Sequence, residues 1–231
     1  MIKFKDIFRQ SGGLWWHLRA VTSGRRYQPF KAQIAHWLER WGVQGPGLIL
    51  VGPSAGWCLQ STFLGRFERI TVFELDPLAQ WLFKLRHARG LTLDWRLADF
   101  LSALPATLQE YPDDVVLFAN VLGQLGFERP KDYELQLSQL KNLLVGRHWG
   151  SFHDRFSAEV SPSTLPSVYS FKANATMTAE SLHALGFSGT WQDHGTAEVF
   201  PTYLEREYFP WWITPQRLQW IEAAWMPAKI V

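Results

Sequence analysis

Short, continuous apolar runs recur along this chain and alternate with stretches of helical periodicity. The first run is Leu48–Val51, and a glycine follows it directly. Apolar runs of about four to eight residues bounded by turn signals are typical of strands buried on both faces. Strands are expected at 48–51, 70–73, 91–97, 115–119 and 149–153, and helical patterns fall at 59–64, 76–85, 101–108 and 133–144. This alternation predicts an α/β fold, a doubly wound and mostly parallel sheet with helices on both faces.

The last third of the chain departs from this alternation. Residues 157–172 are rich in Ser and Pro and predict a loop, whereas 178–187 predict a short helix with Thr178 as its cap. Residues 191–213 contain β-formers that can add a closing antiparallel pair, so the expected sheet has seven strands. Apolar residues at helical spacing after Pro215 predict a terminal helix through Trp225.

The segment before the first strand has a different pattern. Phe30, Ile34, Trp37, Leu38 and Trp41 recur at helical spacing and predict one apolar face. We therefore divide the chain into an N-terminal helical arm, residues 1–44, and a Rossmann-like domain, residues 45–231. The arm precedes the first strand and can fold over the strand ends as a lid.

Composition narrows the class of protein. With 47% hydrophobic and 19% charged residues, the chain can bury a sizeable core. One cysteine, Cys58, excludes an internal disulfide and a cysteine-based zinc site, and no metal site is expected. The net charge of +2 does not indicate nucleic acid. The sequence shows neither a secretory signal nor an apolar stretch that could span a membrane, so we expect a cytoplasmic protein.

Candidate binding residues follow three of the predicted strands. The first strand runs into Gly52-Pro53-Ser54-Ala55-Gly56, where glycines allow the backbone to approach a ligand closely. The second strand is followed by Glu74, at a spacing from Gly52 that suits binding of the ribose hydroxyls. Asp99 and Phe100 follow the third strand, where a carboxylate and a ring can meet an adenine. Because ligands of parallel sheets bind beyond the carboxyl ends of the strands, these residues predict a bound nucleoside.

The identity of the nucleoside is narrowed by Trp57. The dinucleotide fingerprint needs a third glycine for close packing of helix on strand, and Trp57 stands at that position. NAD is therefore disfavoured. A phosphate loop of the Walker type is absent from the sequence because no Gly-Lys-Ser/Thr follows the glycines.

Taken together, these motifs resemble the class I S-adenosylmethionine-dependent methyltransferases over residues 45–187. The resemblance rests on the Gly52–Gly56 segment after the first strand, on Val72-Phe-Glu-Leu-Asp-Pro77, on Ala98-Asp-Phe100, on Asp114 to Leu122 and on the helix that ends in Gly186-Phe187. It implies S-adenosylmethionine as the cofactor. Gly52, Pro53, Ser54 and Gly56 would then hold the methionine end, Glu74 the ribose, and Asp99 with Phe100 the adenine. Asn120 would face the reacting centre.

Two positions depart from the family pattern. The family often has an acid two residues before the first glycine, where this chain has Leu50, and Ser54 replaces the middle glycine. Both positions lie beside the methionine moiety in the family, so the departures concern affinity for the cofactor.

A methyltransferase needs a general base only when its acceptor must lose a proton. The candidate is His153 with Asp154 beside it, although neighbours on a strand point to opposite faces. His194 is a weaker candidate. The alternative function is a methyltransferase-like binding or assembly protein without turnover. The acceptor, a small molecule or a protein, and the oligomeric state cannot be read from these residues.

Overall fold

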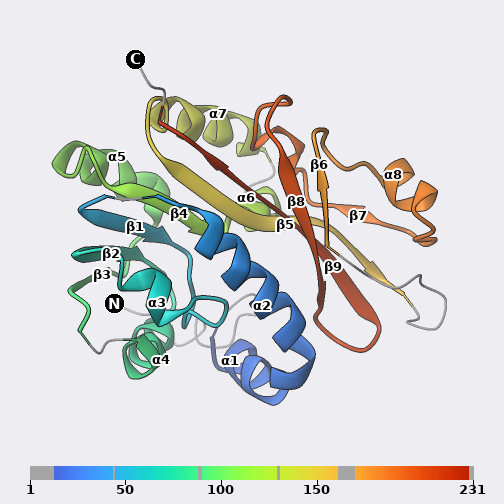
Figure 1. Ribbon diagram of the computed structural model, residues 1–231, viewed down its shortest axis with the longest axis horizontal. Coiled ribbons are helices and arrows are strands. Elements are labelled where there is room, and N and C mark those ends of the chain that lie inside the picture. The colour runs from blue at the N-terminus through green and yellow to red at the C-terminus, as the bar shows by residue number, and fades with distance from the viewer. Residues whose placement is uncertain (1–12, 44, 88–89, 129–130, 161–169, 229–231) are drawn as a thin grey trace.

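The computed structural model describes residues 13–43, 45–87, 90–128, 131–160 and 170–228. Nine strands form one sheet in the order β3-β2-β1-β4-β5-β9-β8-β6, and β7 pairs with β5 (Figure 1). Pairing is parallel from β3 to β5 and antiparallel from β5 onwards. The expected α/β class is confirmed, with two strands more than the seven predicted.

The parallel half of the sheet consists of the strands that the apolar runs predict. They are β1 (Gly47–Val51), β2 (Arg69–Phe73), β3 (Leu93–Arg96), β4 (Val115–Ala119) and β5 (Trp149–Glu159). β5 extends six residues beyond the predicted 149–153. The intervening helices are α3 (Ser61–Leu64), α4 (Pro77–His87), α5 (Phe100–Glu110), α6 (Leu122–Glu128) and α7 (Tyr133–Leu143).

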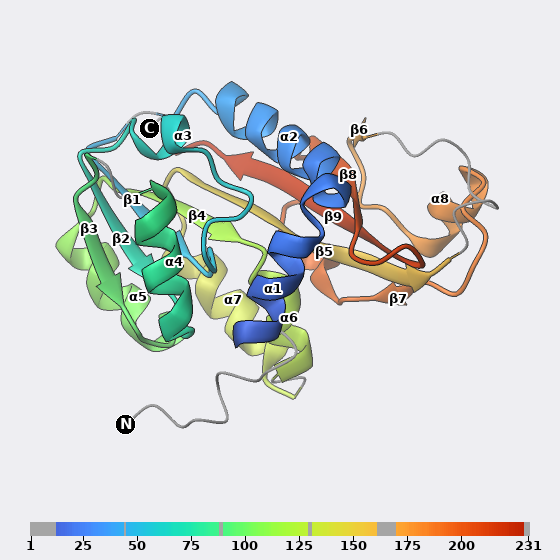
Figure 2. The same cartoon turned by 90° about the horizontal axis from the view of Figure 1, so that it is seen from below.

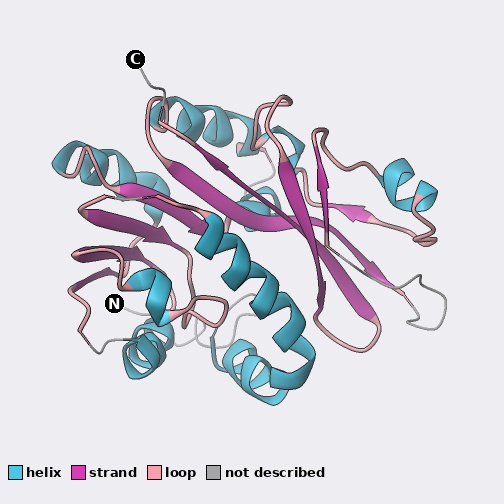
Figure 3. Ribbon diagram, viewed as in Figure 1, coloured by secondary structure: helices cyan, strands magenta, loops and turns pink. Residues whose placement is uncertain are grey.

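The C-terminal part adds the antiparallel half. It contains β6 (Phe171–Ala173), α8 (Ala179–Ala184), β7 (Gln192–Asp193), the 3-10 helix η3 (Thr196–Glu198), β8 (Arg206–Trp212) and β9 (Arg217–Met226). Figure 3 shows these strands continuing the sheet away from its parallel half. Thr178 caps α8 as predicted, with its side chain accepting a hydrogen bond from the Ser181 N–H at 3.2 Å.

Two predictions for this part are wrong. The terminal helix expected from Pro215 to Trp225 is strand β9, which lies between β5 and β8 and is buried along most of its length. Burial on both faces removes the polar–apolar alternation of a half-exposed strand, so Leu218, Ile221 and Trp225 also fit a helical period. The loop expected at 157–172 contains the end of β5 and the start of β6; residues 161–169 lie outside the described residues.

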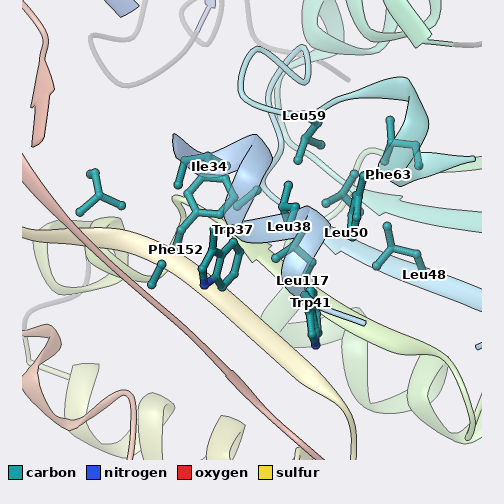
Figure 4. Packing of buried hydrophobic residues seen from close by; sticks show 14 of the residues in the cluster. Ile34, Trp37, Leu38, Trp41, Leu48, Leu50, Leu59, Phe63, Leu117 and Phe152 are labelled. Atoms are coloured by element: carbon teal, nitrogen blue, oxygen red, sulfur yellow. The ribbon is translucent and has the colours of Figure 1, made fainter. Parts of the chain in front are cut away.

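The arm forms two helices, α1 (Gly13–Thr22) and α2 (Gly24–Arg40), while residues 1–12 and 44 lie outside the described ranges. α2 packs against the sheet and shares one hydrophobic core with β1, α3 and β4. Figure 4 shows Trp37 of this helix and Trp41, the residue after it, in the same cluster as Phe152 of β5 and Leu50 of β1. The arm is therefore part of the main core rather than a separately packed extension.

The two faces of the sheet carry separate cores. Leu48 and Leu50 of β1 belong to the core under α2 and α3, whereas Ile49 and Val51 belong to the core under α5 and α7. Figure 2 shows the two helix layers on opposite sides of the sheet. Among the described residues, no helix is long and apolar enough to cross a membrane.

Candidate functional site

The order of the strands reverses between β1 and β4, and this switch point brings the loops after the two strands together. The Cβ of any larger residue at Gly52 would lie 2.6 Å from the Cβ of Val121. Gly52 also has a φ of +65°, a conformation that glycine adopts without strain. In open α/β sheets, such a switch point at the carboxyl ends of the strands is where ligands bind.

The loop after β1 has the conformation of a tight ligand-binding turn. Ser54 and Gly56 have φ values of +51° and +66°. A Cβ at Gly56 would lie 2.8 Å from His87 Nε2, so both glycines have steric as well as conformational reasons to be glycine. Ser54 Oγ is buried and has no hydrogen-bond partner among the described residues.

Trp57, which occupies the position of the missing third glycine, has its own partners. Its indole N–H donates to His17 Nδ1 at 3.1 Å, and the Arg86 guanidinium lies 4.4 Å from the centre of its ring. The tryptophan thus connects the loop after β1 to α1 and α4, a role that a dinucleotide-binding glycine could not fill.

Glu74 lies at the end of β2, beside the glycine loop. Its Oε2 accepts a hydrogen bond from the Ser54 N–H at 2.7 Å, and its Oε1 accepts from the Leu75 N–H at 2.8 Å and the Asp76 N–H at 3.1 Å. Burial raises the pKa of Glu74, while these N–H groups oppose the shift. The carboxylate therefore links the loops after β1 and β2 in addition to any contact with a ligand.

Asp76 caps α4 and also binds the arm. Its Oδ1 accepts a hydrogen bond from the Leu78 N–H at 2.9 Å. Its Oδ2 accepts from the Gly13 N–H at 2.8 Å and lies 2.9 Å from His17 Nε2. Although burial acts in the opposite direction, the hydrogen bonds from His17 and Gly13 lower the pKa of Asp76. These contacts place α1 beside the carboxyl ends of β1 and β2, where a lid was expected; no sequence signal reveals the His17 partner.

The residues expected to meet an adenine have structural roles here. Asp99 caps α5 by accepting a hydrogen bond from the Leu101 N–H at 3.1 Å. Phe100 is buried, and its ring packs edge-on to Phe118 at 5.9 Å. A cavity of about 640 Å³ starts at Asp99 and runs between α5 and α7, with Leu104, Gln136 and Leu140 among its lining residues. This cavity lies in the helix layer, and the glycine loop does not line it.

Asn120 and Asp154 come together beyond the end of β4. Ala119, the last residue of β4, pairs with Phe152, so Asp154 lies on the part of β5 that extends past its neighbour. The Asn120 side chain is hydrogen-bonded to the Asp154 carboxylate, yet the Oδ1 atom of each residue is buried and has no partner in the part of the chain that the structure describes. Burial raises the pKa of Asp154 to about 7, opposed by Arg217 and by Asn120. Asn120 has a φ of +60°, a strained conformation of the kind found at functional sites.

His153 points to the opposite face of the sheet from Asp154. It is fully buried, Nδ1 lies 2.9 Å from Ser151 Oγ, and the ring packs against Phe200. Burial, together with Arg155 and Arg206, lowers the pKa of His153 to about 3. The histidine is therefore neutral at pH 7, but it has no route to an acceptor in this conformation. The structure separates the two candidates for a general base.

His194 belongs to the same interior region as His153. Its Nε2 lies 3.0 Å from Ser157 Oγ. Nearby, the buried Arg206 and Glu222 form an ion pair at 3.0 Å, and Glu222 also accepts a hydrogen bond from the Tyr208 hydroxyl. No sequence signal predicts this ion pair, because Arg206 and Glu222 come from separate strands and neither belongs to a motif.

Comparison of the sequence with protein-family models and with curated proteins found no match. The fold is similar to several solved structures. The N-methyltransferase NodS from Bradyrhizobium japonicum WM9 is 14% identical over 86% of this chain and 96% of that chain, with a TM-score of 0.47. The DhpI–SAH complex is 13% identical over 93% and 94% of the two chains, with a TM-score of 0.44. The [4+2]-cyclase SpnF is 14% identical over 60% and 46%, with a TM-score of 0.36. The fold assignment itself rests on the strand order.

Proposed function

We propose that this chain is an S-adenosylmethionine-dependent methyltransferase that acts on an acceptor still to be identified. The observation that carries the proposal is the switch point between β1 and β4. There the glycine loop after β1, the Glu74 carboxylate and the Asn120–Asp154 pair lie at the same edge of the sheet. Ser54 Oγ, Asn120 Oδ1 and Asp154 Oδ1 are buried and have no hydrogen-bond partner within the described ranges, which supports a ligand at this edge.

The donor set of the site fits this cofactor. An amino-acid tail, a ribose and an adenine need both donors and acceptors, which the glycine loop, Glu74 and Asp99 can supply. A carboxylate offers about four acceptor positions. Three positions on Glu74 are filled by backbone N–H groups, so one remains for a ribose hydroxyl. Phe100 would contribute through the core beneath the site rather than by stacking.

The chemistry that S-adenosylmethionine would supply is a methyl group already activated on its sulfonium. This chain then has to hold the acceptor in line with that group and exclude water. α1, fixed to the site by Asp76 and Trp57, is the element placed to do so. Because His153 is fully buried, it is not placed to take a proton if the acceptor must lose one.

A catalytically inactive binding protein is the alternative function. Two observations favour it: His153 lies in the core, and most acceptor positions of Glu74 already serve the fold. Such a protein would still bind S-adenosylmethionine without transferring its methyl group.

Methyl transfer distinguishes the two functions, whereas binding of S-adenosylmethionine does not. Methyl-labelled S-adenosylmethionine would be incubated with the purified chain and with small-molecule and protein fractions of a cell extract. The proposal predicts label in one fraction that depends on the chain and disappears after heat inactivation of the chain. Binding without label in either fraction would support the alternative. A rise in melting temperature with NAD but not with S-adenosylhomocysteine would contradict both.

A further inference from the structure

The carboxylates at the carboxyl edge of the sheet differ in how many hydrogen bonds their oxygens already accept. Both Glu74 oxygens accept backbone N–H groups, and both Asp76 oxygens are used by α4 and by the arm. Asp99 caps α5. Asp154 differs, because it is buried and its Oδ1 has no hydrogen-bond partner among the residues that the structure describes.

An unpaired carboxylate oxygen in a buried position carries a large desolvation cost, which a bound cation or N–H donor relieves. Asn120 adds a second unpaired acceptor, its own Oδ1. A group that pairs with both oxygens must donate at least two hydrogen bonds, and a positive charge on it would stabilise the carboxylate. An ammonium group has three donors and a positive charge, and so meets both requirements.

Two glycines shape the surroundings of the Asn120–Asp154 pair. At Gly123, a Cβ would lie 3.0 Å from both the Cβ and the backbone oxygen of Asp154, so the glycine lets α6 pack closely on β5 at this residue. Asn120 follows the last residue of β4, next to the switch point occupied by Gly52 and Val121. The Asn120–Asp154 pair therefore lies at the switch point, next to the loop after β1 that the resemblance assigns to the methionine end of the cofactor.

We propose that Asp154, together with Asn120, binds the α-ammonium group of the methionine moiety. This inference rests on the proposed function, because it takes the cofactor as given. It also gives a physical account of Leu50, which is fully buried in β1 between Val72 and Leu117 and offers no charge to the site. The carboxylate that receives the ammonium comes from β5 instead.

The test compares two nucleosides that differ in the amino-acid tail. S-adenosylhomocysteine has the α-ammonium group, whereas 5′-methylthioadenosine keeps the nucleoside and the sulfur but lacks the tail. Calorimetry would measure both with the wild type, Asp154→Asn and Asn120→Gly. Asn is close in shape to Asp, and glycine suits the positive φ at position 120, so both variants should fold. Asp113→Asn, an exposed position outside the site, is the matched control.

We expect Asp154→Asn to reduce the affinity for S-adenosylhomocysteine at least tenfold, and Asn120→Gly to reduce it several-fold. The affinity for methylthioadenosine should stay unchanged in both variants. Equal affinity of S-adenosylhomocysteine for the wild type and Asp154→Asn would overturn the inference. A parallel loss for both nucleosides would also overturn it, because the effect would not depend on the ammonium. If the wild type binds neither nucleoside, the proposed function fails instead, so the two failures are distinguishable.

Discussion

Glu74 accepts a hydrogen bond from the backbone N–H of Ser54 at 2.7 Å, and this contact ties the end of β2 to the loop after β1. The two residues are twenty positions apart, yet they set the shape of the same edge of the sheet. The carboxylate expected to bind a ribose is thus also a structural part of the glycine loop.

Replacing Glu74 by Ala should reduce both affinity and stability. Three backbone N–H groups lose their acceptor, which should cost about 1–3 kcal/mol of unfolding free energy. Affinity for S-adenosylhomocysteine should fall roughly ten- to a hundredfold, as expected for losing hydrogen bonds to a charged group. Chemical denaturation and calorimetry measure the two effects, with the exposed Glu68→Ala as control. An unchanged affinity would rule out the ribose contact.

Asp76→Ala should loosen the arm. The substitution removes the cap of α4 together with the contacts to Gly13 and His17, and cap loss alone costs about 1 kcal/mol. Asp132→Ala is a matched control, because Asp132 precedes α7 without capping it through its side chain. Limited proteolysis after Arg19 should accelerate in Asp76→Ala only. Equal cleavage rates in both variants would mean that Asp76 does not hold α1.

Asp76 should also make the stability of the fold depend on pH. The pKa of Asp76 is lowered in the folded state, so its stabilising effect is present above the ordinary value of 3.8 and is lost as pH falls below it. The difference in melting temperature between the wild type and Asp76→Ala should therefore shrink between pH 5 and pH 3. A constant difference would show that the charge of Asp76 contributes nothing.

Asp154→Asn should have the opposite pH dependence. The pKa of Asp154 is raised from 3.8 to about 7 by burial, so folding is favoured when the group is protonated, and this advantage disappears as pH rises to about 7. Asn has no charge to bury. The melting temperature of Asp154→Asn relative to the wild type should therefore increase from pH 5 to pH 8 in the absence of ligand. A relative stability that is independent of pH would place the Asp154 carboxylate in contact with water.

Strands β1, β2 and β4 could be predicted because each is a largely apolar run, and Gly52 and Glu74 could be placed because they follow two of those runs directly. Strand β9 could not be predicted, because burial on both faces leaves no alternation of polar and apolar residues in its sequence. His17 and Asp76 are distant in sequence and belong to no motif, so their contact emerges only from packing. Likewise, only the register of β5 shows that Asp154, and not His153, reaches the switch point.

The most direct test of the account is calorimetric titration of S-adenosylhomocysteine into the wild type, Gly52→Ala and Gly90→Ala. Both glycines have a positive φ, +65° and +76°, so both substitutions strain the backbone. A Cβ at Gly52 also meets Val121 at 2.6 Å at the proposed site, whereas a Cβ at Gly90 meets nothing within 4 Å. We predict one molecule bound per wild-type chain, at least tenfold weaker binding to Gly52→Ala and unchanged binding to Gly90→Ala. No binding to the wild type, or equal affinity for all three proteins, would contradict the placement of the cofactor at the switch point between β1 and β4.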